Sequence, residues 1–215
     1  MPLDTLLAAL SWAAVAVLAV AGALTASRKQ LDPVGFILVA CVTAFGGGSL
    51  RDLLLGKPVF WLETPGTVAL ASALALLVFF TAHRLERRFT PLLWADAVGL
   101  ALFAVLGAEA AHHKGASPWA CILLGMVTAT FGRALRDVLC QELPLILRRE
   151  IYATAAALGA GIFIGLTELG LPRGTALLAG AAACFSLRAT AILRGWSLPT
   201  YNARPGRNYP DRPRN

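Results

Sequence analysis

Long apolar runs recur along the whole chain and limit the folds that it can adopt. An α-helix needs roughly 20 mostly apolar residues to cross a hydrocarbon core of about 30 Å. Hydrophobic residues make up 57% of the chain and charged residues 14%, which excludes an ordinary water-soluble protein. We therefore predict an all-α membrane protein with seven transmembrane helices. The predicted spans are Leu6–Ala26, Pro33–Leu55, Gly66–Ala82, Leu93–Ala111, Ser117–Cys140, Ile151–Leu169 and Gly174–Leu193.

Basic residues gather at alternate ends of these spans. A chain that crosses the membrane at every span carries Lys57, Lys114 and Arg173 on one side. Many more basic residues lie on the other side, and the positive-inside rule places that side in the cytoplasm. They are Arg28, Lys29, Arg84, Arg87, Arg88, Arg148, Arg149, Arg194, Arg204, Arg207, Arg212 and Arg214. We predict a multi-pass protein of the cell inner (plasma) membrane, with the N-terminus outside and the C-terminus in the cytoplasm.

The net charge of +7 is explained by this topology. The charge lies in short loops beside the spans rather than on one folded basic face, so we expect no nucleic-acid partner. No basic cluster precedes the first apolar run, so we do not expect a cleavable signal peptide. Residues 197–215 are rich in proline, arginine and asparagine, and we predict a disordered cytoplasmic tail there.

A polar phrase occurs in both the second and the fifth span. It reads Gly-Gly-Gly-Ser-Leu-Arg-Asp over Gly46–Asp52 and Gly-Arg-Ala-Leu-Arg-Asp over Gly132–Asp137. Glycine is less favourable in a helix than alanine by about 0.8–1 kcal/mol, so we predict that these two helices are broken. Unwound backbone is tolerated at membrane depth only where it is buried in protein or lines a wet cavity. In a simpler interpretation, the glycines allow close helix packing and the arginines extend to the membrane interfaces.

The chain is an internal duplication. A shift of 85 positions puts Arg51-Asp52 on Arg136-Asp137, and the match continues without gaps to Pro33 on Pro118. Each unit holds three spans, and an odd number of spans inserts the second unit upside down. We predict two inverted three-helix repeats, over residues 1–92 and 93–172, and a seventh helix over residues 173–196 that has no copy.

Other polar residues in the spans have less specific interpretations. We interpret Asp96 as an interfacial carboxylate of the N-cap type, with a polar pore residue as the alternative. Arg133 stands where the first copy has Gly48, and it can pair with Asp137 one helical turn later. Arg188 lies near the cytoplasmic end of the seventh span and is expected to extend to the interface.

No motif in the chain indicates catalysis. A nucleophile elbow, a Walker loop, a zinc-protease motif and a dinucleotide fingerprint are all absent from the sequence, so we do not expect an enzyme. The cysteines are expected to be buried and reduced. We expect neither a metal site nor a cofactor.

The repeated phrase, the three-plus-three spans and the extra seventh span resemble the prokaryotic members of the trimeric intracellular cation (TRIC) channel family. The repeat domain of that family is also known as a glycine-transporter domain. The resemblance covers about residues 5–195. It implies a homotrimer among membrane lipids, with a water-filled pore in each protomer that conducts potassium and other monovalent cations past kinks in helices 2 and 5. The pore and kink residues predicted on this basis are Gly46, Gly47, Gly48, Arg51, Asp52, Gly132, Arg133, Arg136 and Asp137.

The second copy of the phrase departs from the family pattern, and three functions stay open. Phe131 and Arg133 stand at the positions of Gly46 and Gly48. A passive cation channel is the leading interpretation, with Asp52 and Asp137 neutralising the adjacent arginines. A secondary transporter of a small zwitterion such as glycine would also use broken helices in an inverted repeat. A non-conducting structural membrane protein would have no need of the polar phrase.

Overall fold

The computed structural model describes residues 3–84, 89–144 and 150–199, and this part of the chain is built from helices. The predicted tail and the basic residues Arg87, Arg88, Arg148 and Arg149 lie largely or wholly outside the described residues. The elements are α1 (Leu3–Arg28), α2 (Pro33–Leu54), α3 (Phe60–Glu63), α4 (Gly66–Thr81), η1 (Ala82–Arg84), α5 (Phe89–His113), α6 (Pro118–Leu139), α7 (Ala153–Glu168) and α8 (Arg173–Arg194).

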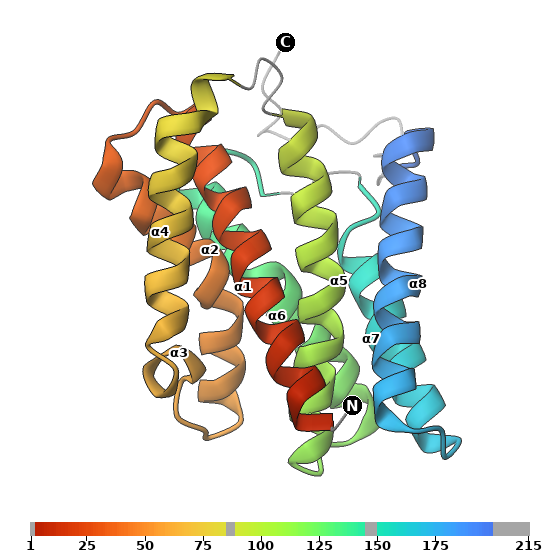
Figure 1. Cartoon of the computed structure of the whole chain (residues 1–215). Helices are drawn as coiled ribbons and strands as arrows, with labels where there is room; N and C mark the ends of the chain where they lie inside the picture. Colours follow the sequence, from red (N-terminus) through yellow and green to blue (C-terminus); the bar gives the residue numbers. More distant parts are fainter. Residues whose placement is uncertain (1–2, 85–88, 145–149, 200–215) are drawn as a thin grey trace, which may run out of the picture.

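The long helices form one bundle with two faces, which Figure 1 shows at its lower and upper ends. We call the face where α1 begins the N-terminal face, and the face where α8 ends the C-terminal face. From the N-terminal face, α1 rises, α2 descends and α4 rises, whereas α5 descends, α6 rises and α7 descends (Figure 1). The first and second sets of three helices therefore run in opposite directions.

Five helices are long and apolar enough to cross a membrane: α1, α2, α5, α6 and α8. They confirm a multi-pass membrane protein. The helices α4 and α7 are also apolar but have 16 residues each. At 1.5 Å per residue they are about 24 Å long, somewhat short of a hydrocarbon core of about 30 Å.

The ends of α2 and α6 and the turns beside them are equivalent at the same offset of 85 positions as the sequence repeat. Both helices begin at a proline, and both end 21 positions later, at positions that differ by 85. The residue before each proline caps the helix: Asp32 accepts from the N–H of Gly35 at 2.7 Å, and Ser117 accepts from the N–H of Ala120 at 3.4 Å. Positive φ angles also occur in equivalent pairs, at Gln30 and Gly115 before the helices and at Gly56 and Gln141 after them.

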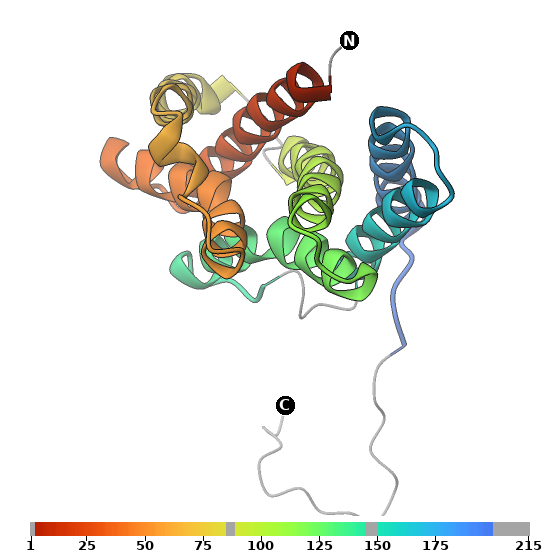
Figure 2. The same ribbon diagram turned by 90° about the horizontal axis from the view of Figure 1, so that it is seen from below.

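The central packing joins equivalent helices of the two halves. The helix α1 packs against α5, and α2 packs against α6. Figure 2, viewed from the N-terminal face, shows α4 on one side of this centre and the α7–α8 pair on the other. The helix α5 contacts α1, α6, α7 and α8, so its side chains are the best placed to be enclosed by protein.

The predicted breaks in α2 and α6 are wrong, because both helices continue through the polar phrase. Residues 33–54 are α-helical without interruption, and so are residues 118–139. Glycine lowers helix stability because its backbone loses the most conformational entropy and is left open to water. Here the backbone of the neighbouring helix covers the glycines, so the packing that they allow stabilises the helical conformation.

The glycines of α2 and α6 face each other reciprocally. A Cβ atom on Gly47 would collide with the carbonyl oxygen of Thr128, and one on Gly132 would lie 2.6 Å from the carbonyl oxygen of Thr43. A Cβ atom on Gly46 would lie 3.0 Å from the Cα atom of Gly132. The Gly47–Thr128 and Gly132–Thr43 contacts are equivalent to each other at an offset of 85 positions. The glycines therefore serve the close helix packing that the simpler interpretation assigned to them.

A second pair of glycines allows the first two helices of each half to pack closely, α1 on α2 and α5 on α6. A Cβ atom on Gly22 of α1 would lie 2.7 Å from Oγ1 of Thr43 on α2. The equivalent atom on Gly107 of α5 would lie 2.6 Å from Oγ1 of Thr128 on α6. The four central helices thus approach closely, because glycines stand at the α1–α2, α5–α6 and α2–α6 crossings.

Candidate functional site

The first Arg-Asp pair lies beside a cavity that opens at the N-terminal face. The guanidinium of Arg51 donates through Nε to Oδ1 of Asp52 at 2.8 Å, and its Nη2 lies 2.7 Å from the same oxygen. Both side chains line a cavity of about 460 Å³, which we call the vestibule. Its other charged lining residues are Lys57, Glu63 and Glu109.

The short helix α3 forms one wall of the vestibule and was not predicted from the sequence. The N–H of Phe60 donates to Oδ2 of Asp52 at 3.0 Å, and the Phe60 ring centroid lies 5.7 Å from Cζ of Arg51. A Cβ atom on Gly48 would lie 2.5 Å from Cε1 of Phe60. Gly48 therefore seats this aromatic ring against α2, and the ring in turn shields the ion pair.

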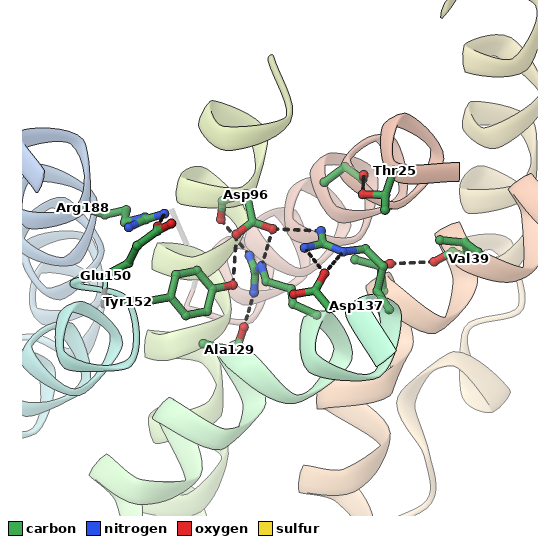
Figure 3. Close-up of polar contacts among 12 residues, drawn as sticks. Thr25, Val39, Asp96, Ala129, Asp137, Glu150, Tyr152 and Arg188 are labelled. Carbon is green, nitrogen blue, oxygen red and sulfur yellow. Dashed lines mark hydrogen bonds and ion pairs between the residues drawn. The ribbon is translucent and has the colours of Figure 1, made fainter. Parts of the chain in front are cut away.

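The second Arg-Asp pair lies in a group of five side chains that is almost completely enclosed. We call this group the buried cluster; its members are 2% exposed or less. Figure 3 shows Asp96 of α5, Asp137 of α6 and Tyr152, just before α7, converging on it from three directions. The buried cluster consists of Asp96, Arg133, Arg136, Asp137 and Tyr152.

Asp96 is the centre of the buried cluster. Its Oδ1 accepts from Nε of Arg133 at 2.8 Å and from Nη1 of Arg136 at 3.2 Å. Its Oδ2 accepts from the hydroxyl of Tyr152 at 3.0 Å. Nη2 of Arg133 also donates to the main-chain oxygen of Asp96 at 2.8 Å, and Nη1 donates to the main-chain oxygen of Ala129. One carboxylate on α5 therefore binds side chains from α6 and from the residue that precedes α7.

The ionised side chains of the buried cluster balance one another. Arg136 donates through Nε to Oδ1 of Asp137 at 2.8 Å, and its Nη2 lies 2.8 Å from the same oxygen. With Asp96 shared between Arg133 and Arg136, two arginines meet two aspartates. Enclosed charges are costly unless they are paired and hydrogen-bonded, and this arrangement meets that condition.

Two sequence-based interpretations of the buried cluster need correction. Asp96 is not an N-cap residue, since it lies two turns inside α5, which begins at Phe89. The three guanidinium nitrogens of Arg133 donate across to Asp96 and back to Ala129, whereas sequence reasoning paired Arg133 with Asp137. The geometry follows from the packing of α5 on α6, which places a carboxylate within reach of Arg133.

A signal for the Arg133–Asp96 pair was present in the repeat. Relative to the first copy, Arg133 replaces Gly48 and Asp96 replaces Ser11, both at an offset of 85 positions. A charge of each sign was thus added to the same half of the chain. Reading the two departures together, rather than one at a time, predicts that they compensate each other.

Arg188 of α8 lies beside the buried cluster and not at an interface. Its side chain is 2% exposed, and its Nη2 lies 2.5 Å from Oε2 of Glu150. The expectation that Arg188 extends to the interface is therefore wrong. The partly exposed carboxylate of Glu150 is within reach, and pairing with it replaces the hydration that the interface would supply.

The described residues offer no obvious metal site. Within residues 3–84, 89–144 and 150–199, no three His, Cys, Asp or Glu side chains lie close enough together to hold a metal ion. Cys41, Cys121, Cys140 and Cys184 are free thiols. The chemistry available in this part of the chain is that of paired charges, hydroxyl groups and glycine-lined helix crossings.

A bundle of membrane-length helices that encloses paired charges defines a polytopic membrane protein with a polar interior, and comparison with known proteins agrees. The family model described as "Glycine transporter" matches two segments, residues 8–84 and 93–168. A UPF0126 membrane protein of Vibrio cholerae is 38% identical over 190 residues, covering 86% of this chain and 79% of that protein. The UPF0126 inner membrane protein YadS of Escherichia coli is 37% identical over 191 residues, covering 86% and 91% respectively.

Solved structures extend the comparison to channels. The TRIC trimeric intracellular cation channel orthologue from Rhodobacter sphaeroides matches with a TM-score of 0.86 and 51% identity, over 89% of this chain and 100% of that one. A prokaryotic TRIC channel in 0.5 M KCl matches with a TM-score of 0.86 and 30% identity, over 91% and 100%. The chain therefore belongs to the glycine-transporter family, which is that of the prokaryotic TRIC channels.

Proposed function

We propose that this protein is a channel for monovalent cations, permeable to potassium, with one pore in each protomer. The observation that carries the proposal is the placement of the two Arg-Asp pairs on α2 and α6, one beside an open vestibule and the other in the buried cluster. Charged groups are retained inside a membrane bundle mainly where they serve a polar pathway. The 51% identity to a trimeric cation channel supports the same function.

The assembly and topology that we propose follow the same relatives and the basic-residue pattern. We propose a homotrimer in the inner membrane, in contact with lipids, with the N-terminal face outside and the C-terminal face toward the cytoplasm. We also propose seven crossings arranged as two inverted repeats plus α8. The opposed helix directions and the two matched segments of the family model support this arrangement.

The predicted pore residues take unequal parts in this proposal. Gly46, Gly47 and Gly132 bring α2 and α6 close enough to share the pathway, and Gly48 makes room for Phe60. Arg51 and Asp52 face the vestibule. Arg133, Arg136 and Asp137 belong to the buried cluster, which we propose closes the pathway toward the C-terminal face. Since each arginine is paired with an aspartate, the pathway presents little net positive charge to an entering cation.

Ion pairs at the C-terminal face support closure on that side. Oε1 of Glu142, which follows α6, lies 3.5 Å from Nη2 of Arg28 and 3.4 Å from Nζ of Lys29. These contacts link the end of α1 to the end of α6. The positions equivalent to Glu142 and Lys29 on the N-terminal face are Lys57 and Lys114. Two lysines repel each other, so these two positions on the N-terminal face form no ion pair equivalent to that between Lys29 and Glu142.

Recording from purified protein in planar bilayers tests the proposed function. Under a potassium chloride gradient we expect discrete current steps whose reversal potential lies toward the potassium equilibrium potential. Chloride-selective current would contradict the proposal. Slow, saturable flux coupled to glycine would support the zwitterion transporter instead, and the absence of either kind of flux would favour a structural protein.

The vestibule charges give a further prediction. The charged lining residues are Arg51, Lys57, Asp52, Glu63 and Glu109, so acidic groups exceed basic groups by one. Lys57→Glu makes the vestibule more negative and should raise the local cation concentration. At about 0.01 M salt, where charges act over about 30 Å, we expect the unitary potassium conductance to rise about two-fold.

Salt and position provide the controls for this measurement. At about 1 M salt the screening length falls to about 3 Å, and the effect of Lys57→Glu should disappear. Arg194→Glu makes the same charge change at an exposed position on the C-terminal face, at the far end of the bundle from the vestibule, so its effect should be much smaller. A conductance that is unchanged by Lys57→Glu at low salt would show that cations do not enter through the vestibule.

A further inference from the structure

The helix α8 has no equivalent in the first half of the chain, yet it carries one of the most deeply enclosed arginines. Arg188 is 2% exposed and lies less than two turns before the end of α8 at Arg194. An arginine so close to a helix end ordinarily extends its guanidinium to the interface. Its Nε has no hydrogen-bond partner among the described residues. Full hydrogen bonding of the guanidinium therefore does not explain why Arg188 is enclosed.

Arg188 contacts three consecutive residues that precede α7. Its Nη2 donates to Oε2 of Glu150 at 2.5 Å, its Nη1 donates to the main-chain oxygen of Ile151 at 3.2 Å, and its Cζ lies 5.2 Å from the ring centroid of Tyr152. Ser197, just after α8, forms an isolated antiparallel bridge with Glu150. The C-terminal part of the chain therefore holds this segment through both a side chain and the backbone.

Tyr152 connects that segment to the buried cluster. Its hydroxyl donates to Oδ2 of Asp96 at 3.0 Å, while the other oxygen of Asp96 accepts from Arg133 and Arg136. The ring centroid of Tyr152 also lies 5.9 Å from Cζ of Arg133. Figure 3 shows Tyr152 between the Arg188–Glu150 pair on one side and Asp96 on the other. Moving the segment would therefore move a hydrogen-bond donor of Asp96.

We propose that Arg188 is a positioning residue for channel closure, which it favours by holding Tyr152 against Asp96. The inference rests on the proposed function, in which the buried cluster closes the pathway. When Tyr152 withdraws, Asp96 keeps only its arginine partners, and the cluster loses its connection to α7. The helix α8 thus sets the balance between closed and open states without lining the pathway itself.

Single-channel recording of Arg188→Met tests this role. Methionine keeps an unbranched, flexible stem but removes the guanidinium and with it both hydrogen bonds to the segment. We expect the open probability to rise by at least about five-fold, the lower end of typical coupling between sites, with an unchanged unitary conductance. Glu150→Gln should act in the same direction by a smaller factor. Arg194→Met, an exposed change on the same helix, is the matched control and should leave the open probability unaltered.

A double variant separates positioning from a general loss of structure. If Arg188 acts through the hydroxyl of Tyr152, then Tyr152→Phe alone should raise the open probability, and adding Arg188→Met should change it little further. Independent, multiplicative effects of the two substitutions would overturn the inference. An unchanged open probability in Arg188→Met, in a protein that folds and conducts normally, would overturn it as well.

Hydrogen exchange of the protein in lipid nanodiscs tests the same contact without any current. The amides of residues 150–154 should exchange faster in Arg188→Met than in the unsubstituted protein or in Arg194→Met. Unchanged exchange in this segment would contradict the holding role of Arg188. Faster exchange in a protein that passes no cations would support the contact while contradicting the proposed channel, so the two ideas fail separately.

Discussion

Replacing Asp96 with asparagine is expected to lower the free energy of unfolding by about 3–5 kcal/mol, the cost of removing one partner of an enclosed ion pair. The variant leaves Arg133 and Arg136 with Asp137 as the remaining carboxylate of the buried cluster, so one positive charge is uncompensated. Denaturation of the purified protein in mixed micelles measures the loss. Thermal stability in the same detergent should fall in parallel.

A second substitution should restore much of this stability. Asp96→Asn combined with Arg133→Gln returns the buried cluster to neutrality, leaving the Arg136–Asp137 pair intact. The double variant should therefore be more stable than Asp96→Asn alone. Ser11→Ala, at the position equivalent to Asp96 in the first half, is the control and should change stability little. If the two destabilising effects simply add, Asp96 and Arg133 do not compensate each other and the assignment fails.

Adding one methyl group to Gly47 is expected to destabilise the protein by about 3 kcal/mol, the upper part of the usual range for overpacking. The new Cβ atom would meet the carbonyl oxygen of Thr128, which belongs to the backbone of α6 and cannot rotate away. Gly47→Ala must therefore separate α2 from α6. The free energy of unfolding in mixed micelles gives the size of the effect.

The reciprocal crossing makes this prediction sharper. Gly132→Ala places its Cβ atom against the carbonyl oxygen of Thr43, on the other side of the same crossing. Once one methyl group has separated the helices, the second should cost little, so the double variant should lose less than the sum of the single losses. Gly165→Ala is the matched control, because its Cβ atom would meet nothing within 4 Å in the exposed part of α7. A loss of similar size in Gly165→Ala would mean that the crossing is not responsible.

Local signals were sufficient to predict most helix positions. The second span was predicted at Pro33–Leu55, and α2 occupies Pro33–Leu54; the third was predicted at Gly66–Ala82, and α4 occupies Gly66–Thr81. The apolar run sets the length of a helix, and proline with a capping residue sets its start. These determinants are short stretches of chain, so the sequence displays them directly.

The predictions that failed depended on contacts between distant segments. The breaks at the glycines were inferred from helix propensity alone, but the backbone around Thr128 covers Gly47 and keeps the helix intact. The partner of Arg133 lies 37 positions away on α5, so no spacing rule within one helix could identify it. Arg188 reaches Glu150 over a similar separation of 38 positions.

By itself, the sequence determined that this is a membrane protein of two related halves, that each half carries a phrase with glycine before Arg-Asp, and which family it belongs to. Apolar run length, repeat offset and motif spacing are properties of the chain, and the thickness of the bilayer sets the run length whatever the packing. Only the tertiary structure decided that one copy of the phrase opens on a vestibule while the other is enclosed. That asymmetry arises because Asp96 and Arg133, which replace Ser11 and Gly48, meet across two helices and neutralise each other.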